Sequence, residues 1–211
     1  MTGVGNNNRG KMITLGLTGS IGMGKTTAAE GFRRFGVPVF DADQTVHMIM
    51  KKGGIAHAAI VAMFPDAVVN GNIDRRRLGD IVFGDDDALG RLERLIHPLV
   101  RVHEEGFLEG ARRGGYDLAV LEIPLLFETG DAGRCDKIVV VTAPADVQEA
   151  RVLERPGMTP EKLAAIRARQ LPDGEKRARA DFLIDTSKPK EKNLKVIESI
   201  IRHLRSNKAP L

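Results

Sequence analysis

The chain has 211 residues, of which 42% are hydrophobic, and its 32 Lys and Arg against 28 Asp and Glu give a net charge of +4. This length is ordinary for one domain, or for one core with inserted subdomains, and it is sufficient to bury a full hydrophobic core. The mild basic excess, with one Tyr and no Trp to stack on bases, argues against a nucleic-acid-binding protein.

No apolar run approaches the roughly 18 residues needed to cross a bilayer, so we expect no membrane association. The single Cys135 excludes an intrachain disulfide and a cysteine-based zinc cluster, and it is consistent with a reducing cytoplasm. Residues 1–11 are rich in Gly and Asn and lack an apolar stretch, so we expect a flexible extension and no signal peptide. We therefore predict a cytoplasmic protein.

A phosphate-binding loop is the strongest motif in the chain. Residues 12–17 form an apolar, strand-length run, and the pattern Gly-x4-Gly-Lys-Thr follows at residues 19–26. The glycines let the backbone approach an anion closely, so that N–H groups face a triphosphate at the start of the next helix. Lys25 would contact the β- and γ-phosphates, and the Thr26 hydroxyl would contact Mg2+. The residues expected to bind ATP here are Gly19, Ile21, Gly22, Met23, Gly24, Lys25, Thr26 and Thr27. A glycine-rich turn without a nucleotide is the alternative.

Two aspartates follow the next predicted strand. Residues 26–35 form a predicted helix, and residues 37–40 form a strand that ends in Asp41-Ala42-Asp43. If the helix is a crossover in a parallel sheet, the two strands are near neighbours and their carboxyl ends lie close together. An Asp-x-Asp pair after a strand also suits a helix cap or turn. After a phosphate loop, we favour catalysis for at least one of the two.

Residues 44–115 show helical patterns and no convincing buried strand. We expect helices over 44–51, 55–64 and 85–96. A further helix is expected to begin after Asp74, which would be its N-cap. A new helix is predicted to start at His97-Pro98 and to run to residue 111. Such an insertion would cover a second substrate. His97 either binds that substrate or serves as a cap or packing residue, and Arg75, Arg76 and Arg77 form either a solvated face or phosphate contacts.

The next strands bring further candidates to the carboxyl edge of the sheet. The strand over 117–123 places Glu122 at its end, where phosphate-loop enzymes often carry a metal-supporting carboxylate. The apolar residues of the 124–128 segment, Pro-Leu-Leu-Phe-Glu, would form either a substrate wall or a core plug. Residues 137–141 form a continuous β-branched strand, as expected in a parallel sheet.

Two short helices around Pro156-Gly157 suggest a mobile lid. The first carries Arg151 and Arg155, and the second begins at Thr159 as an N-cap, runs to Gln170 and ends at Pro172. Arg donates two parallel hydrogen bonds to phosphate, so we expect one or two of the lid arginines to bind phosphate and the others to be solvated. These arginines are Arg151, Arg155, Arg167 and Arg169. A short strand over 182–184 and an amphipathic helix over 191–204 complete the pattern.

These motifs together resemble dephospho-CoA kinases, over residues 12 to about 204. The matching stretches are 17–27, 41–43, 95–99 and 123–128, together with Gln170, Lys176 and residues 180–185. The chain departs from the family at Thr186, where Asn is usual, and at Arg155-Pro156-Gly157, where Arg-Asp/Asn-Gly is usual. The resemblance implies an α/β fold: a three-layer phosphate-loop kinase core with a parallel five-stranded sheet, a helical substrate-binding insertion and a helical lid.

The resemblance also implies a reaction, namely ATP-dependent phosphorylation of the ribose 3′-hydroxyl of dephospho-CoA to give coenzyme A and ADP. ATP and dephospho-CoA would be the partners, with Mg2+ bound to the ATP, and the chain would be a monomer or a weak homo-oligomer. The expected catalytic residues are Asp43 at the acceptor hydroxyl, Lys25 and Arg151, and Arg155 would also bind ATP. The expected substrate contacts are Asp41, Asp43, His97, Pro124, Leu125 and Glu128. Thr26 would hold Mg2+, with Asp41 or Glu122 acting through water.

The predicted organisation is an extension at 1–11, a nucleotide-binding core at 12–43, 116–153 and 180–211, a substrate domain at 44–115 and a lid at 154–179. Two other functions remain open from the residues alone. One is another small-molecule or nucleoside-monophosphate kinase, and the other is a nucleotide-dependent switch module. The chain has no Asn-Lys-x-Asp motif, which argues against a GTPase.

Overall fold

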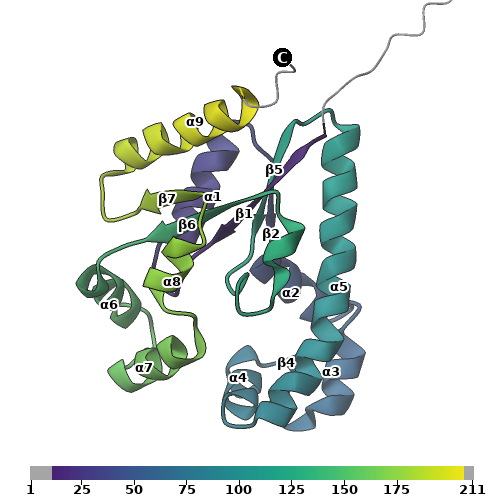
Figure 1. Ribbon diagram of the computed structural model, residues 1–211. Helices are drawn as coiled ribbons and strands as arrows, with labels where there is room; N and C mark the ends of the chain where they lie inside the picture. Colours follow the sequence, from purple (N-terminus) through teal and green to yellow (C-terminus); the bar gives the residue numbers. More distant parts are fainter. Residues whose placement is uncertain (1–10, 207–211) are drawn as a thin grey trace, which may run out of the picture. The chain divides into compact units, whose positions relative to one another are not determined.

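The computed structural model describes residues 11–206, so the expectation for an N-terminal extension lies, apart from Lys11, outside the described residues. The chain divides into two compact units (Figure 1). One unit, here called the sheet unit, holds the described chain up to Phe40 and from Gly110 onward. The other, the helical unit, is Asp41–Glu109.

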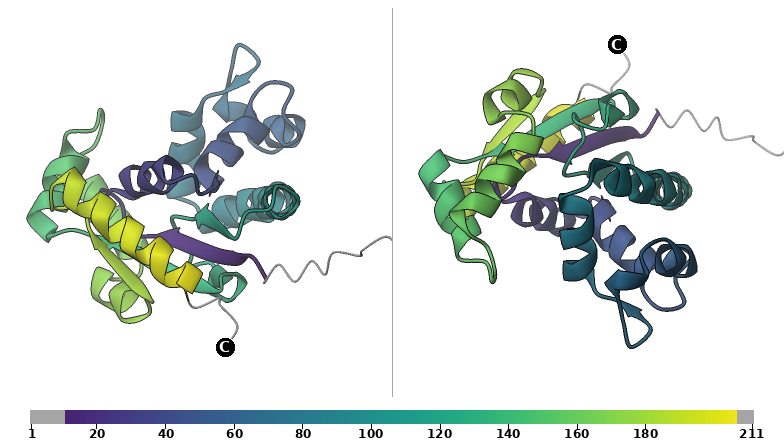
Figure 2. Two further views of the ribbon diagram at one scale, coloured as in Figure 1. Left: turned by 90° about the horizontal axis from the view of Figure 1, so that it is seen from above. Right: turned by 90° about the horizontal axis from the view of Figure 1, so that it is seen from below.

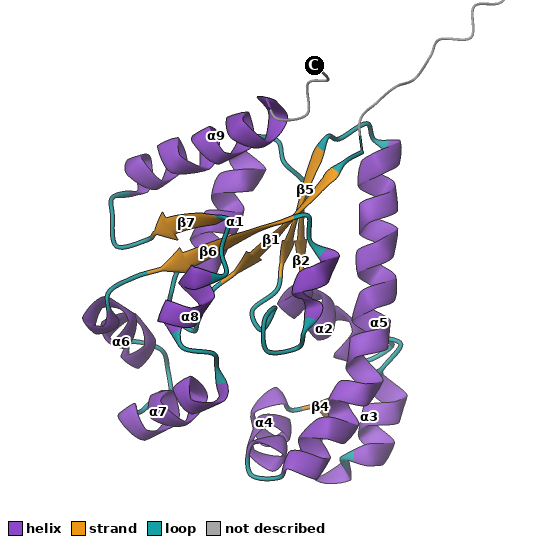
Figure 3. Cartoon of the chain, in the orientation of Figure 1, coloured by secondary structure: helices purple, strands orange, loops and turns teal. Residues whose placement is uncertain are grey.

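A five-stranded parallel sheet forms the centre of the sheet unit (Figure 3), which confirms the predicted fold class. The strands are arranged in the order β2-β5-β1-β6-β7. Their bounds are β1 Ile13–Thr18, β2 Val39–Asp41, β5 Leu118–Glu122, β6 Lys137–Thr142 and β7 Phe182–Asp185. β1 pairs with β5 on one side and with β6 on the other. The expectation that β1 and β2 are near neighbours needs a correction, because β5 lies between them.

Both faces of this sheet are covered, which explains why its strands are continuously apolar. α1 (Lys25–Arg34) and α9 (Lys190–Ser206) contact each other and share one hydrophobic core with alternate strand residues (Figures 1 and 2). On the opposite face, Gly16 lies against Leu126 and Cys135, where a Cβ would come within 2.8 Å of the cysteine sulfur. The helix α8 (Asp173–Ala178) contacts β6.

The helical unit has its own core. It contains α2 (Ala42–Met50), α3 (His57–Met63), α4 (Arg75–Phe83) and most of α5 (Asp86–Arg113). A 3-10 turn at Pro65–Ala67 leads into a small antiparallel hairpin, β3 (Val68–Val69) with β4 (Asn72–Ile73). The buried core residues include Ile49, Ile60, Phe64, Leu78, Val82 and Ile96. The predicted N-cap is confirmed, because the Asp74 carboxylate accepts hydrogen bonds from the N–H groups of Arg76 and Arg77.

The predicted helix start at His97-Pro98 is wrong, because α5 runs without interruption from Asp86 to Arg113. An internal proline lacks the N–H donor, and its ring crowds the carbonyl four residues earlier, at a cost of about 3 kcal/mol. Apolar residues on both sides of Pro98 pack into the core of the helical unit, among them Ile96 and Leu99. Burial of these side chains offsets the local cost. His97 therefore cannot cap a helix.

Two further helices follow β6 in the sheet unit. They are α6 (Ala145–Leu153) and α7 (Pro160–Arg169), and Thr159 caps α7 as predicted by accepting a hydrogen bond from the Lys162 N–H. The sequence did not predict α8, because its six residues contain no apolar periodicity and the residue that it buries is Lys176. Within residues 11–206, none of the helices combines the length and the apolar character that crossing a bilayer needs.

Replacing Phe32 tests the core of the sheet unit. Phe32 on α1 is fully buried, so Phe32→Ala should lower the free energy of unfolding by about 3–5 kcal/mol through lost burial and a cavity. Urea unfolding measures the change. Phe83→Ala is the matched control, because Phe83 is 41% exposed and should cost far less. Equal losses in the two variants would contradict this description of the core.

Candidate active site

The phosphate loop, Gly19–Thr27, connects the end of β1 to the first turn of α1. Gly22 and Gly24 have φ angles of 74° and 82°, which other residues rarely adopt. Gly24 is the N-cap of α1 and carries no capping side chain, so the first N–H groups of the helix stay available to an anion. The Lys25 ammonium donates to the Gly19 carbonyl at 2.7 Å, which holds it over the loop. This geometry is that of a nucleotide-phosphate site.

Thr186, just after β7, ties this loop to a predicted lid arginine. Its buried hydroxyl donates to the Met23 carbonyl at 2.8 Å and accepts from Arg151 at 2.9 Å. A second Arg151 nitrogen donates to the Thr186 carbonyl at 2.8 Å. Arg151 is thereby fixed beside the phosphate loop, whereas Arg155 is exposed. The sequence pattern marks Thr186 only as a departure from the family and does not indicate this role.

The carboxyl end of β5 lies beside the phosphate loop. Glu122 is buried and is paired in register with Leu17, which lies two residues before Gly19, the first residue of the loop. The Thr18 hydroxyl donates to the Pro124 carbonyl at 3.1 Å and so attaches the 124–128 segment to the end of β1. Within that segment, Leu126 is fully buried and acts as the core plug, whereas Leu125 is 38% exposed and remains available to a substrate.

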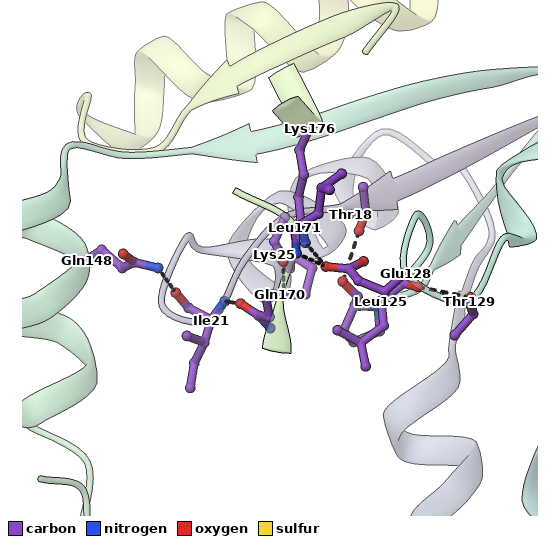
Figure 4. Close-up of polar contacts among 12 residues, drawn as sticks. Thr18, Ile21, Lys25, Leu125, Glu128, Thr129, Gln148, Gln170, Leu171 and Lys176 are labelled. Carbon is purple, nitrogen blue, oxygen red and sulfur yellow. Dashed lines mark hydrogen bonds and ion pairs between the residues drawn. The ribbon is translucent and has the colours of Figure 1, made fainter. Parts of the chain in front are cut away.

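Glu128 forms a buried ion pair with Lys176 (Figure 4), at 2.7 Å between Oε1 and Nζ. The same Oε1 accepts a hydrogen bond from the Leu171 N–H at 2.9 Å. Burial opposes ionisation, but the Lys176 ammonium and the Leu171 N–H outweigh it and hold the pKa of Glu128 below its ordinary value of 4.5. In the structure, Glu128 therefore connects the 124–128 segment to α8. Its predicted contact with substrate stays a prediction.

The helical unit contains the other predicted site residues, and the structure separates the roles of the two aspartates. Asp41 ends β2 and caps α2, since its carboxylate accepts from the Gln44 N–H at 2.8 Å. Asp43 lies in the first turn of α2 with an exposed side chain. His97 is exposed in the middle of α5, so it is neither a cap nor a core residue. Asp43 is the carboxylate of the pair that is not used as a helix cap.

A nucleotide-bound Mg2+ is compatible with these residues. Within the described part of the chain, no three His, Cys, Asp or Glu side chains gather as a metal site. A magnesium ion on ATP needs no such cage, because phosphate oxygens and water supply most of its ligands. Thr26 is exposed in the first turn of α1, where its hydroxyl is accessible to a metal at the phosphates.

The chain is similar to known dephospho-CoA kinases over most of its length. A family model described as Dephospho-CoA kinase matches residues 13–191. A dephospho-CoA kinase of Mesorhizobium japonicum is 55% identical over 197 residues, covering 93% of this chain and 99% of the relative. Another, from Brucella melitensis, is 56% identical over 176 residues, covering 83% of this chain and 87% of the relative.

Two solved structures share the fold of this chain. TT1252 from Thermus thermophilus superposes with a TM-score of 0.80 at 35% identity, covering 92% of this chain and 99% of that chain. The dephospho-CoA kinase of Campylobacter jejuni has a TM-score of 0.68 at 24% identity and covers 93% of this chain and 98% of that chain. At that identity, the second likeness supports the fold alone.

Removing the Thr186 hydroxyl tests its bridging role. Thr186→Val keeps the shape but leaves the Met23 carbonyl without this donor, so the free energy of unfolding should fall by about 1–3 kcal/mol and the KM for ATP should rise several-fold. Thermal unfolding and initial rates measure the two effects. Thr186→Ser keeps the hydroxyl and should stay close to the wild type. Equal behaviour of the Val and Ser variants would refute the role.

The Glu128–Lys176 pair predicts a pH dependence of stability. Because the folded pKa of Glu128 lies below 4.5, the pair's contribution is complete above pH 4.5 and is lost as the pH falls through the folded pKa. Urea unfolding below pH 4.5 should show a steeper loss for the wild type than for Glu128→Gln/Lys176→Met, which leaves no unpaired buried charge. Parallel curves in that range would contradict the assignment.

Proposed function

Because this chain belongs to the dephospho-CoA kinase family, we propose that it transfers the γ-phosphoryl group of ATP to the ribose 3′-hydroxyl of dephospho-CoA, giving coenzyme A and ADP. The observation that carries this proposal is the phosphate loop, with its glycine conformations and Lys25 in place, in a chain that matches the family over nearly its full length. The reaction is a phosphoryl transfer to an alcohol, for which positioning and electrostatics supply most of the catalysis.

On the nucleotide side, the N–H groups at the start of α1 and the Lys25 ammonium bind the β- and γ-phosphates and stabilise the charge that develops during transfer. The Arg151 guanidinium is held by Thr186 beside the loop and adds positive charge there. Arg155 binds the phosphates from the lid, at 154–179. Mg2+, held by Thr26 with Asp41 or Glu122 acting through water, would neutralise phosphate charge.

On the acceptor side, Asp43 orients the 3′-hydroxyl and accepts its proton. The 3′-oxygen forms a bond to the γ-phosphorus, the bond from that phosphorus to the ADP oxygen breaks, and the proton passes to the carboxylate. Asp43 suits this role because it is exposed, whereas the Asp41 carboxylate caps α2. His97, Pro124, Leu125 and Glu128 are the further proposed contacts of dephospho-CoA. A cytoplasmic location and a monomeric or weakly associating chain remain predictions.

Product analysis tests the proposed reaction. The protein is incubated with Mg-ATP and, separately, dephospho-CoA, AMP, CMP or shikimate, and products are separated by chromatography with mass detection. We expect coenzyme A and ADP in equal amounts with dephospho-CoA, and little turnover with the other acceptors. Preference for AMP or CMP would indicate a nucleoside-monophosphate kinase. ATP consumption that requires a macromolecular partner, with every small acceptor inert, would indicate a switch module.

Replacing Asp43 tests the proton acceptor. Asp43→Asn keeps the size but removes the base, so kcat should fall by roughly 10²- to 10⁴-fold while ATP binding changes little. Steady-state rates and ATP titration calorimetry measure the two quantities. Asp80→Asn is the matched control, since Asp80 is an exposed residue on α4 of the same unit, and it should retain wild-type turnover. Near-normal turnover of the Asp43 variant would reject its role.

A further inference from the structure

The tip of the phosphate loop is held by two glutamine side chains from outside the loop (Figure 4). The Ile21 N–H donates to Gln170 Oε1 at 3.1 Å, and the Ile21 carbonyl accepts from Gln148 Nε2 at 2.7 Å. Both peptide groups that flank Ile21 are therefore bound to side chains of the α6–α8 region. In this arrangement the Ile21 N–H donates to Gln170, which leaves the N–H groups at the start of α1 as the donors available to a phosphate.

The orientation of the Gln148 amide is determined by its second partner. Gln148 is buried, and its Oε1 accepts from Arg167 Nε at 3.1 Å and from Nη2 at 2.8 Å. Arginine has only donors, so the amide oxygen must face Arg167 and the amide nitrogen must face the Ile21 carbonyl. Arg167, one of the predicted lid arginines, thus supports the loop through Gln148.

Gln170 is anchored through its neighbour in the chain. The Leu171 N–H donates to Glu128, which is paired with the fully buried Lys176. A buried ion pair of this kind is costly to break, because removing one partner leaves the other charge buried without a counter-charge. It therefore fixes the backbone at residues 170–171 and places the Gln170 side chain against the loop.

The loop packs closely on the same region. A Cβ at Gly22 would lie 2.5 Å from Val152 Cγ2 and 3.1 Å from the Gln148 carbonyl oxygen. Gly22 has a φ angle of 74°, in the left-handed region, and the peptide group that precedes it carries the Ile21 carbonyl. Hydrogen bonds to this peptide select one loop conformation among those that glycine permits.

We propose that Gln148 and Gln170 are positioning residues that hold the phosphate loop in its ATP-binding conformation, with Arg167 and the Glu128–Lys176 pair fixing them. This inference rests on the proposed function only in taking ATP as the loop's ligand. Neither glutamine needs to touch the nucleotide. Each restricts the Ile21 peptide groups before ATP arrives, so that less ordering is required on binding.

The test compares the affinity of the protein for ATP with its affinity for dephospho-CoA. Gln170→Met removes the acceptor for the Ile21 N–H, and Gln148→Glu removes the donor to the Ile21 carbonyl while keeping the contact with Arg167. Each should raise the Kd of a non-hydrolysable ATP analogue, measured by calorimetry, and the KM for ATP by about 3- to 10-fold, the worth of one hydrogen bond. The KM for dephospho-CoA should stay unchanged. Lys195→Met, an exposed change on α9 and outside the lid, is the control and should leave all three values unchanged.

A merely structural role would instead lower kcat or the melting temperature with both KM values unchanged, and that result would overturn the proposal. Unchanged analogue affinity in both glutamine variants would overturn it as well. If a variant fails to fold, hydrogen exchange of the Ile21 amide in the wild type tests the contact instead. The Ile21 N–H should be protected from exchange without nucleotide, and an unprotected N–H would refute the contact. Analogue binding needs no acceptor, so inactivity of the wild type towards dephospho-CoA would count against the proposed function alone.

Discussion

The phosphate loop must present backbone N–H groups to a polyanion, although residues 19–24 form neither helix nor strand. Glycines make this conformation accessible, but they also permit many others. Contacts from outside the loop select among these. The Thr186 hydroxyl binds the Met23 carbonyl, and Gln148 and Gln170 bind the two peptide groups around Ile21. The rest of the sheet unit holds these three side chains in place.

The buried Lys176–Glu128 pair belongs to the same support. Desolvating two charges costs several kcal/mol, and replacing such a pair by apolar residues is often neutral or stabilising, so its presence is weak evidence for added stability. What the pair does here is geometric. It joins the 124–128 segment, which follows β5, to α8 and to the Leu171 N–H. The pair thereby fixes the short connection between α7 and α8.

Local sequence patterns predicted the features that depend on local physics. The strands of the sheet, the phosphate loop and the Asp74 and Thr159 caps follow from apolar runs, glycine spacing and capping residues close in the chain, and the structure confirms them. Features that depend on distant contacts were missed. Burial around Pro98 overrides its tendency to end a helix, and α8 buries a lysine whose partner lies 48 positions earlier.

The residues of the candidate site also differ in whether a local pattern or a distant contact identifies them. Gly24 and Lys25 were identified because their motif is contiguous. Thr186 and Gln148 were missed as loop supports because each acts across more than 100 positions, through hydrogen bonds that no local pattern records. The aspartate pair was predicted in part. Its location at the end of β2 follows from the sequence, but the assignment of Asp41 as a cap required the geometry of α2.

A crystal structure of the protein with a non-hydrolysable ATP analogue and dephospho-CoA would show whether the phosphate loop and Asp43 meet at the transferred group. We expect the triphosphate on the Gly19–Thr27 loop, and the Asp43 carboxylate within hydrogen-bond reach of the ribose 3′-oxygen, about 2.6–3.2 Å or through one water. A triphosphate bound elsewhere, or an Asp43 carboxylate well beyond one bridging water from that oxygen, would contradict this expectation.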